Sequence, residues 1–441
     1  MNPIPSKAPT LDKVAWRPAA DLAARSNNPR IHSKKQVRQI ADSIRRFGWT
    51  NPVLVDEAGI LLAGHGRLEA AKLLGQATVP TLVLSHLNEA EKRAYVVADN
   101  RLAELAGWDK SLLAIELKEL SILDPDLDLT LTGFDMGEID VLILGGDETA
   151  DGDVADDLSA IPDGPAVSRL GDLWQIGEHR LLCGDSLQSA SYAALMGTDR
   201  ARLVISDPPY NVPVAGHVRV GDDHREFVMA SGEMSAAEFE TFLATAFTRF
   251  REASLDGAIQ IIAMDWRHLS ETLAAGTAVY DDFKNLCVWT KSNPGMGSLY
   301  RSQHELFLVF KAGKAPHVNN VELGVHGRNR TNVWSYAGAT GFGPDRAEML
   351  ALHPTVKPVA LVADAILDCS NRHDIVLDGF AGSGTILLAA QRTGRRARAI
   401  EIDPIYVDRA LRRCIDAFGI EPIHIETGKT FSAIAAERAA H

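Results

Sequence analysis

An apolar run, Leu203 to Ile205, leads into Asp207-Pro208-Pro209-Tyr210, and this junction constrains the fold more than any other stretch. Two consecutive prolines cannot continue the hydrogen-bond ladder of a sheet, so the strand has to end there. The carboxyl end of a buried strand is the usual place for a site in an open α/β sheet. The Asp207 carboxylate and the Pro208 carbonyl can accept hydrogen bonds, and Tyr210 can stack on a ring. The junction therefore predicts a pocket for a flat ring that bears an amino group.

A second strand-like run, Ile375 to Leu377, leads into a glycine-rich turn and then into a helical pattern. Glycines at such a turn let the backbone approach a ligand closely. The next strand-like run, Ala397 to Ile400, ends in Glu401 and Asp403, and an acid about 20 residues after the glycines is spaced to bind ribose hydroxyls. The glycines do not spell the dinucleotide fingerprint G-x-G-x-x-G, which favours S-adenosylmethionine over a pyrophosphate cofactor. The turn reads Asp378-Gly379-Phe380-Ala381-Gly382-Ser383-Gly384-Thr385.

Together with two further segments, these stretches resemble the DNA amino-methyltransferases in their permuted, β-type order, in which D-P-P-Y precedes the cofactor loop. The resemblance covers roughly Leu170 to Phe418. It implies an α/β class I S-adenosylmethionine-dependent methyltransferase fold, which is Rossmann-like with a mostly parallel sheet. The two further segments are Leu182-Cys183-Gly184-Asp185-Ser186 and His353-Pro354-Thr355-Val356-Lys357-Pro358.

The resemblance also implies roles for single residues. Asp185 would bind the adenine side of the cofactor, Thr355 and Lys357 would lie near its methionine carboxylate, and Glu401 would hold the ribose. The family usually has proline where this chain has Gly379, and this departure removes no group that contacts the cofactor. The catalytic set would be Asp207, Pro208, Pro209 and Tyr210. The cofactor-binding set would be Asp185, Ser186, Thr355, Lys357, Asp378, Phe380, Gly382, Ser383, Gly384, Thr385, Glu401 and Asp403.

The cysteines restrict the target atom. Methylation of a cytosine ring carbon needs a cysteine nucleophile, conventionally in a Pro-Cys pair, and no cysteine here follows a proline. We therefore expect an amino nitrogen as the target. The resemblance implies that it is the N6 amino group of adenine in double-stranded DNA, with the base flipped out of the duplex. D-P-P-Y favours adenine because cytosine enzymes of the family more often carry serine in the first place. The alternatives are a cytosine N4 enzyme, a DNA-binding regulator with a degenerate methyltransferase domain, and an RNA or protein methylase. The cysteines are Cys183, Cys287, Cys369 and Cys414.

The amino-terminal part resembles a small α+β domain of the ParB/sulfiredoxin type over about residues 11 to 110. Strand-like runs at Pro52 to Val55 and Ile60 to Leu62 precede the segment Gly64-His65-Gly66-Arg67, which opens a helix. Backbone amides and an arginine at one helix start suit a phosphate, so this segment is a candidate phosphate or nucleotide site. The alternative is a structural turn in a docking module.

Length and charge predict the domain organisation. A chain of 441 residues is long enough for two folded units. Six acids and no base lie between Gly145 and Ser159, a composition typical of a solvated, disordered linker. We expect a ParB-like domain with trailing helices over residues 1–144, the linker over 145–165, the methyltransferase domain over 166–425 and a carboxyl-terminal tail over 426–441.

A net charge of −13 means that phosphate contacts must come from local clusters. The segment from Arg328 to Trp334 mixes bases, amides and an aromatic ring, which are the residue types that contact DNA. The scattered cysteines lack a C-x-x-C pair, no run of about 18 apolar residues occurs, and Met1 to Pro9 lacks an apolar signal core. We expect a cytoplasmic protein that binds DNA but neither membrane nor metal; a homodimer and a nucleotide or protein partner of the ParB-like domain stay open. The candidate DNA contacts are Arg328, Arg330, Asn332 and Trp334.

Overall fold

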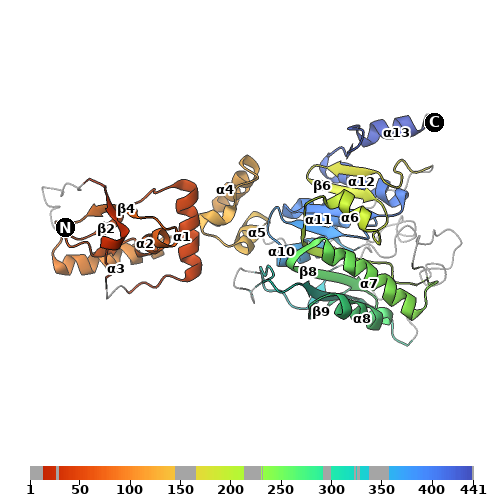
Figure 1. Cartoon of the computed structure of the whole chain (residues 1–441), viewed down its shortest axis with the longest axis horizontal. Coiled ribbons are helices and arrows are strands. Elements are labelled where there is room, and N and C mark those ends of the chain that lie inside the picture. Colours follow the sequence, from red (N-terminus) through yellow and green to blue (C-terminus); the bar gives the residue numbers. More distant parts are fainter. Residues whose placement is uncertain are drawn as a thin grey trace. The chain divides into compact units, whose positions relative to one another are not determined.

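The structure is a computed structural model that describes residues 13–25, 29–144, 165–212, 230, 232–291, 299–321, 324, 328–336 and 357–439. The chain divides into two compact units, Met1–Gly145 and Gly146–His441 (Figure 1). Each unit has hydrophobic clusters of its own. Within the described residues, no helix is long and apolar enough to cross a membrane.

The amino-terminal unit builds a small sheet in the order β1-β4-β2-β3. Strand β2 is parallel to β4, whereas β1 and β3 are antiparallel to their neighbours. Buried aliphatic side chains of β2, β3 and β4 pack against Leu68 and Ala71, which follow the predicted Gly64–Arg67 turn. The strands are β1 (Ala15–Pro18), β2 (Val53–Val55), β3 (Leu61–Ala63) and β4 (Thr78–Val83).

Three helices of this unit, α1, α3 and α4, begin at side chains that cap free backbone amides. Ser33 accepts from the Gln36 amide at the start of α1, and Asn88 and Glu91 form a capping box at the start of α3. At the start of α4, the Asp109 side chain accepts from the amides of Ser111 and Leu112. The helices are α1 (Lys34–Phe47), α2 (His65–Leu73), α3 (Glu89–Leu105), α4 (Lys110–Leu123) and α5 (Met136–Leu144), with 3-10 turns η1 (Ala19–Asp21) and η2 (Leu129–Thr132).

The carboxyl-terminal unit contains one large sheet, in the order β11-β9-β10-β8-β7-β12-β13-β6-β5-β14. The five strands from β8 to β6 are parallel, and antiparallel strands extend the sheet on both sides. This confirms the predicted α/β class with a mostly parallel central sheet. The strands are β5 (Leu173–Ile176), β6 (His179–Cys183), β7 (Ala201–Ser206), β8 (Ser254–Met264), β9 (Asp282–Thr290), β10 (His304–Ala312), β11 (Val333–Ser335), β12 (Ile375–Asp378), β13 (Arg396–Glu401) and β14 (Ile423–His424).

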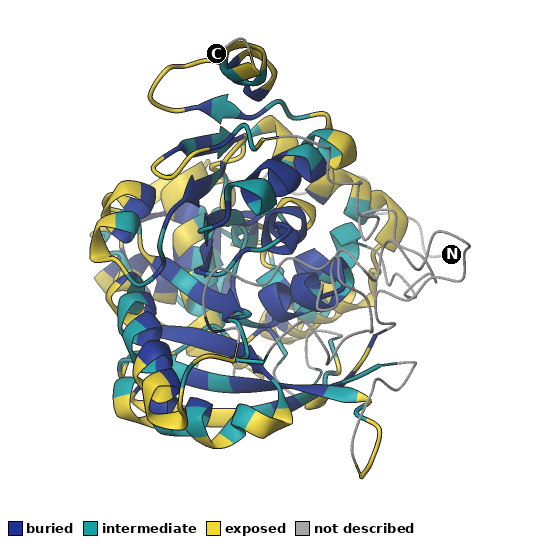
Figure 2. Cartoon of the chain, turned by 90° about the vertical axis from the view of Figure 1, so that its right-hand side faces the viewer, coloured by how far each residue is buried: buried dark blue, intermediate teal, exposed yellow. Residues whose placement is uncertain are grey.

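Helices cover both faces of this sheet, so the central strands are buried between them (Figure 2). Side chains alternate between the faces: Leu203 and Ile205 of β7 join one core, and Val204 joins the other. This two-sided burial explains the continuous apolar runs Leu203 to Ile205 of β7 and Ile375 to Leu377 of β12. One face carries α10 (Val359–Cys369), α11 (Thr385–Thr393) and α12 (Pro404–Phe418), and the other carries α6 (Ser189–Met196), α7 (Ala236–Glu252) and α8 (Leu269–Val279), which follows the short turn η4 (Trp266–His268).

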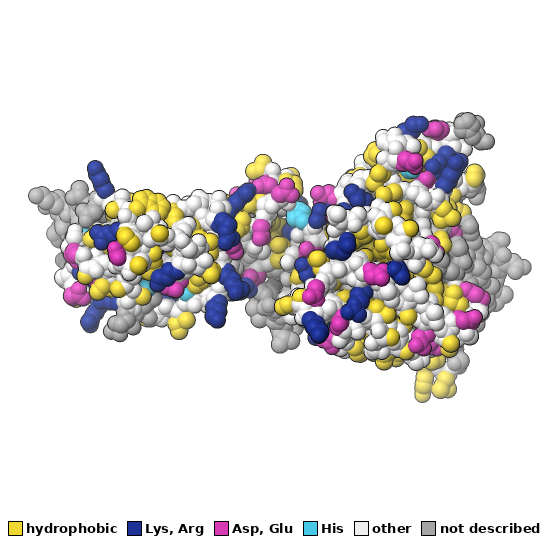
Figure 3. All heavy atoms as spheres, in the orientation of Figure 1, with side chains coloured by type: hydrophobic (Ala, Val, Ile, Leu, Met, Phe, Trp, Pro, Cys, Tyr) yellow, Lys and Arg dark blue, Asp and Glu magenta, His cyan; other side chains and the backbone are white. Residues whose placement is uncertain are grey.

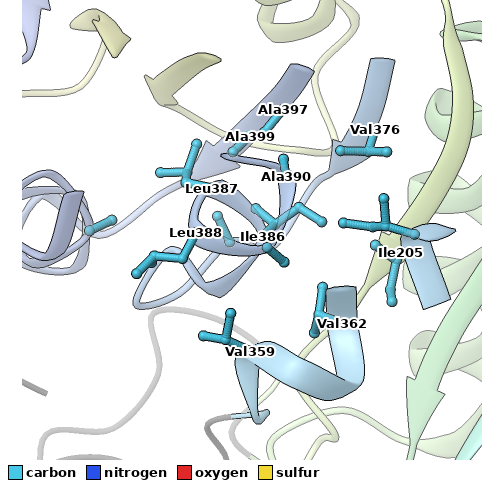
Figure 4. Packing of buried hydrophobic residues seen from close by; sticks show 14 of the residues in the cluster. Ile205, Val359, Val362, Val376, Ile386, Leu387, Leu388, Ala390, Ala397 and Ala399 are labelled. Carbon is cyan, nitrogen blue, oxygen red and sulfur yellow. The ribbon is translucent and has the colours of Figure 1, made fainter. Parts of the chain in front are cut away.

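The packing of α11 places the glycine-rich turn that precedes it. Ile386 and Leu387 of α11 lie in one cluster with Val376 of β12 and Val362 of α10 (Figure 4). Because these side chains are buried among strands and helix, the start of α11 is held at the carboxyl end of β12.

The chain changes direction between β7 and β12. From β7 it passes through α7 to β8 on one side, and from β12 it passes through α11 to β13 on the other side. Such a switch point opens a crevice at the carboxyl ends of the two strands, which is where ligands bind in open α/β sheets. Both predicted site segments, Asp207–Tyr210 and Asp378–Thr385, begin at this crevice.

The segment expected as a carboxyl-terminal tail is part of the fold. Helix α13 (Phe431–Ala439) places Phe431 against Trp174 of β5, with ring centroids 5.4 Å apart. Arg438 pairs with Asp172, and His424 of β14 lies 3.2 Å from the same carboxylate. Apolar and ionic contacts therefore anchor the last helix to the edge of the sheet, and the boundary drawn at residue 425 stays a prediction.

Candidate active site

A buried hydrogen bond joins the two predicted halves of the site. Ser206 Oγ, at the end of β7, donates to Asp378 Oδ1, at the end of β12, over 2.6 Å. The amide of Gly379 in turn donates to Ser206 Oγ at 3.3 Å. The strand that carries D-P-P-Y is thereby fastened to the strand that begins the glycine turn.

Asp207 and Tyr210 contact each other directly. The Tyr210 hydroxyl donates to Asp207 Oδ1 at 2.6 Å. Lys357 Nζ donates to Asp207 Oδ2 at 2.6 Å and lies 3.1 Å from the Tyr210 hydroxyl. Lys357, which the resemblance assigned to the methionine carboxylate of a cofactor, is therefore the partner of the predicted catalytic acid in this structure.

A second carboxylate, which the sequence analysis did not select, completes this cluster. Glu305 of β10 lies 2.9 Å from Lys357 Nζ and 3.2 Å from the Tyr210 hydroxyl. Lys291, just after β9, forms an ion pair with the other oxygen of Glu305. We call Asp207, Tyr210, Lys291, Glu305 and Lys357 the charge cluster.

Exposure separates the members of the charge cluster. The side chains of Lys357 and Glu305 are 7% and 9% exposed, whereas that of Asp207 is 28% exposed. Asp207 is thus the carboxylate that an incoming group can reach, and Glu305 lies behind it.

Burial and neighbouring charges shift the acids of the charge cluster in opposite directions. Burial raises the pKa of Asp207; the Lys357 ammonium opposes this rise, and the Glu305 carboxylate adds to it. Burial acts in the same sense on Glu305, but Lys357 and Lys291 outweigh it and lower the pKa of Glu305 to about 2. Asp207 is therefore the acid of the pair that binds a proton more readily.

Glu401, at the end of β13, closes the glycine turn. Its Oε2 accepts from the Gly382 amide at 2.8 Å, and its Oε1 accepts from the Asp403 amide at 2.8 Å. Burial raises the pKa of Glu401 to about 7, and burial also raises the pKa of Asp378 to about 7. Gly382 has positive φ and open space beside its Cα, so the turn leaves room for a ligand next to Glu401.

Several other predicted cofactor residues have partners within the protein. Ser383 and Thr385 accept from Arg413 of α12 at 3.0 and 3.3 Å. Gly384 approaches α12 so closely that a Cβ there would lie 2.6 Å from that of Ala410. These three residues hold α11 to α12, and Arg413 is a contributor that the sequence analysis did not name.

The remaining cofactor candidates lie around the same edge of the sheet. The Asp185 carboxylate, after β6, accepts from the Leu187 amide at 2.8 Å, and Ser186 is buried. Asp403 caps α12 by accepting from the Ile405 amide at 3.0 Å. The ring of Phe380 packs on Phe242 with centroids 5.9 Å apart. Thr355 lies outside the described residues.

Gly379 owes its identity to packing. A Cβ at this position would lie 2.4 Å from a ring carbon of Phe250 and 3.1 Å from the Tyr192 hydroxyl. A larger residue would therefore collide with the aromatic core under the turn, which accounts for glycine at a position where the resembling family usually has proline.

The candidate DNA contacts are engaged inside the unit. Arg328 and Arg330 both pair with Asp364 and Asp368 of α10, at 2.7 to 3.2 Å. Trp334 is buried, and its ring nitrogen donates to the Thr331 carbonyl at 3.1 Å. Asn332 is exposed and donates to the Leu286 carbonyl at 3.1 Å. Contact of these residues with DNA stays a prediction, and the observed pairs give both arginines a structural role.

On the face of the protein shown in Figure 3, basic and acidic side chains are interspersed on both units. Despite the net charge of −13, this face therefore does not form one continuous acidic surface.

In the amino-terminal unit, Gly64 has φ of +91° and begins α2. Arg67 donates to the Pro52 carbonyl at 2.8 Å, across the turn. Burial lowers the pKa of His65, and a Cβ at Gly66 would meet Ile40 and His32. The four residues of the predicted phosphate site thus share one helix start, and phosphate binding stays a prediction.

Three family models match successive parts of the chain. A ParB N-terminal domain matches residues 11–101, a ParB-methyltransferase helix-turn-helix domain matches 111–170, and a DNA methylase of the N6/N4 type matches 201–412. The ParB-like nuclease domain-containing protein YnaK of Escherichia coli K12 is 48% identical over 81 residues, which are 18% of this chain and 93% of YnaK.

Two solved structures are similar to the carboxyl-terminal part. The complex of M1.HpyAVI with SAM is 21% identical with a TM-score of 0.39, and the match covers 53% of this chain and 97% of that one. The cytosine-N4-specific PvuII DNA methyltransferase is 15% identical with a TM-score of 0.41, and the match covers 58% of this chain and 95% of that one.

Proposed function

We propose that this chain, a DNA methylase of the N6/N4 family fused to a ParB-type amino-terminal domain, methylates the N6 amino group of adenine in DNA. S-adenosylmethionine is the proposed methyl donor. The observation that supports the proposal most directly is the position of Asp207. This partly exposed carboxylate follows a buried strand, precedes two prolines, and is fastened through Ser206 and Asp378 to a glycine turn closed by Glu401.

The donor set around the glycine turn fits S-adenosylmethionine. Glu401 and Asp403 are acids beside the turn, and carboxylates of this kind bind ribose hydroxyls. Open space next to Gly382 admits the body of the ligand, and Phe380 offers a ring face. When bound, S-adenosylmethionine supplies a methyl group on a sulfonium, which is electrophilic and needs no activation by the protein.

The residues of the D-P-P-Y segment act on the amino group. Asp207 and the Pro208 carbonyl each accept a hydrogen bond from the amino group, which draws the nitrogen lone pair out of conjugation with the ring and directs it towards the methyl group. The new bond joins nitrogen to the methyl carbon while the bond from that carbon to sulfur breaks, and the nitrogen then releases a proton to Asp207 or to water. The catalysis comes from alignment and charge placement, so Asp207 need not be a strong base.

The base must leave the helical stack to reach Asp207, because the amino group of a paired adenine lies inside the duplex. Tyr210 contacts Asp207, and stacking of the flipped base on the Tyr210 ring would require the hydroxyl contact of 2.6 Å to loosen. The family includes enzymes that act on the N4 amino group of cytosine, and the same acceptors would serve that target.

The amino-terminal domain is proposed to bind a phosphate or nucleotide at Gly64–Arg67. The supporting observation is the helix start at which Arg67 and the first amides of α2 meet. Arg67 would have to exchange its contact with the Pro52 carbonyl for the ligand.

Mass spectrometry of nucleosides tests the proposed reaction. Unmethylated DNA is incubated with the purified chain and methyl-labelled S-adenosylmethionine and is then digested. Labelled N6-methyladenine supports the proposal, labelled N4-methylcytosine redirects it to cytosine, and label in neither base contradicts it.

A further inference from the structure

We infer that Glu305 is a positioning residue for methyl transfer. It holds the Lys357 ammonium against Asp207, and Lys357 in turn fixes the Asp207 carboxylate, which accepts a hydrogen bond from the amino group of the base. This inference rests on the proposed function and extends it to a strand outside the recognised motifs. Glu305 lies on β10, an antiparallel strand separated from β7 by β8.

The geometry around Lys357 supports this role. An ammonium can donate three hydrogen bonds. Among the described residues, Lys357 Nζ lies 2.6 Å from Asp207 Oδ2, 2.9 Å from Glu305 Oε2 and 3.1 Å from the Tyr210 hydroxyl. Because Asp207 and Glu305 attract the same ammonium, Glu305 helps to fix the position of Lys357 and therefore that of the Asp207 carboxylate.

Burial makes the arrangement consequential. A buried carboxylate destabilises the fold unless it is paired. Glu305 is the second residue of β10, and the residues that follow it, Leu306, Phe307 and Leu308, are all buried and apolar. Fold stability alone would be served as well by an apolar side chain of similar volume. Glu305 is instead linked to Asp207 by Lys357, which forms an ion pair with each of the two carboxylates.

The charges of the cluster balance. Asp207 and Glu305 contribute two negative charges, and Lys291 and Lys357 contribute two positive charges. Removal of Glu305 alone leaves a surplus positive charge beside Asp207, which favours the ionised carboxylate. Removal of Lys291 alone leaves a surplus negative charge, which favours the protonated form.

This balance matters because only an ionised Asp207 accepts at both oxygens. Among the described residues, the other groups that act on it are the Tyr210 hydroxyl, on its own segment, and Asp378 of β12, whose carboxyl interacts with that of Asp207. Neither group changes between the variants below, so the variants isolate the contribution of the Glu305–Lys291 pair.

The test compares Glu305→Gln, Lys291→Gln and the double variant in the full-length chain. For each, kcat for methyl transfer to DNA is measured against pH at saturating S-adenosylmethionine. Glu305→Gln should lower the maximal kcat between about tenfold and 100-fold, because Lys357 loses an anchor and small misplacements of a catalytic group are costly. Glu305→Gln should also move the acid limb of the profile to lower pH.

Lys291→Gln should move the acid limb to higher pH, and the double variant should return it towards that of the wild type. The exposed residues Glu240 and Lys284 provide matched controls, Glu240→Gln and Lys284→Gln, which should leave the profile in place. A purely structural role for Glu305 would change the amount of folded enzyme without shifting the limb. An unmoved limb, or shifts of the same sign in both single variants, would overturn the inference.

A titration without turnover separates this inference from the proposed function. Aspartate labelled with ¹³C at the side-chain carboxyl reports the ionisation of Asp207 by NMR, with Asp207→Asn for assignment. The same opposite shifts should appear in protein alone. If they appear but the wild-type chain methylates no DNA, the charge cluster stands and the proposed reaction fails. If methylation occurs but the titration is unchanged by Glu305→Gln, the inference fails alone.

Discussion

Ser206 Oγ donates a 2.6 Å hydrogen bond to Asp378 Oδ1, and both side chains are buried. In addition to the sheet pairing between β7 and β12, this side-chain contact joins the strand of the proposed catalytic acid to the strand that opens the glycine turn. The relative position of the reacting nitrogen and the methyl donor therefore depends on it.

Ser206→Ala tests this junction. The substitution leaves the buried Asp378 carboxyl without one donor, which should cost about 1–3 kcal/mol of unfolding free energy. Urea denaturation measures that loss, and calorimetry should show weaker binding of S-adenosylmethionine. Thr241→Ala, on the exposed face of α7, is the control and should change neither quantity. Unchanged stability and affinity in Ser206→Ala would mean that the two strands are held by packing alone.

Glu401 should bind the ribose of S-adenosylmethionine through charge-assisted hydrogen bonds worth roughly 1.5–3 kcal/mol. Glu401→Ala should therefore raise the dissociation constant by about one to two orders of magnitude. Calorimetry with the folded variant gives the value, and Glu426→Ala, which is exposed, serves as the control. An unchanged constant would remove Glu401 from the site.

The same residue should make stability depend on pH. The pKa of Glu401 is raised from 4.5 to about 7 by burial, so the folded state holds a proton that the unfolded state has lost between these values. Stability should therefore fall as pH rises from about 4.5 to 7, by up to about 3 kcal/mol from this group. Glu401→Gln removes the titration, so its stability relative to wild type should rise over this window in denaturation experiments without ligand. A constant difference between the two proteins across the window would contradict the raised pKa.

The division after Gly145 predicts independent folding. A chain that begins near Asp163 should give a cooperative unfolding transition and bind S-adenosylmethionine like the full chain. The role of the amino-terminal domain is then tested by measuring methylation of long DNA, with and without nucleotides. The full chain, the truncated chain and the Arg67→Ala variant are compared. If the three proteins methylate at the same rate, at the same sites and with the same salt dependence, the amino-terminal domain has no role in catalysis on DNA. That result would favour a docking module.

Local patterns predicted the parallel core of the fold. The runs Leu203 to Ile205 of β7 and Ile375 to Leu377 of β12 are apolar because both faces of these strands are buried, and each run leads into a polar turn. The charge cluster was not predicted; Glu305 directly precedes the apolar run Leu306 to Phe310, and nothing in the sequence distinguishes it from an exposed acid at a strand end. The partners of Glu305 lie just after β9, just after β7 and just before α10, and only the sheet order brings these segments together.

The Arg328–Arg330 segment shows the opposite difficulty. Two arginines in a loop resemble a DNA contact as long as their partners are unknown. Asp364 and Asp368 are four residues apart on α10, so they share one face of that helix and can pair with both arginines. The spacing of the two acids was readable from the sequence, but the approach of the loop to that face was not.

The most direct test of the account is Asp207→Ala, measured for methyl transfer and for cofactor affinity in the same preparation. Because Asp207 holds the amino group and not the cofactor, methyl transfer should fall by about 100-fold or more while the dissociation constant for S-adenosylmethionine stays within a few-fold. Asp282→Ala, at an exposed position on β9, should leave both values unchanged. Loss of cofactor binding in a folded Asp207→Ala variant, or methyl transfer at the wild-type rate, would contradict the central claim.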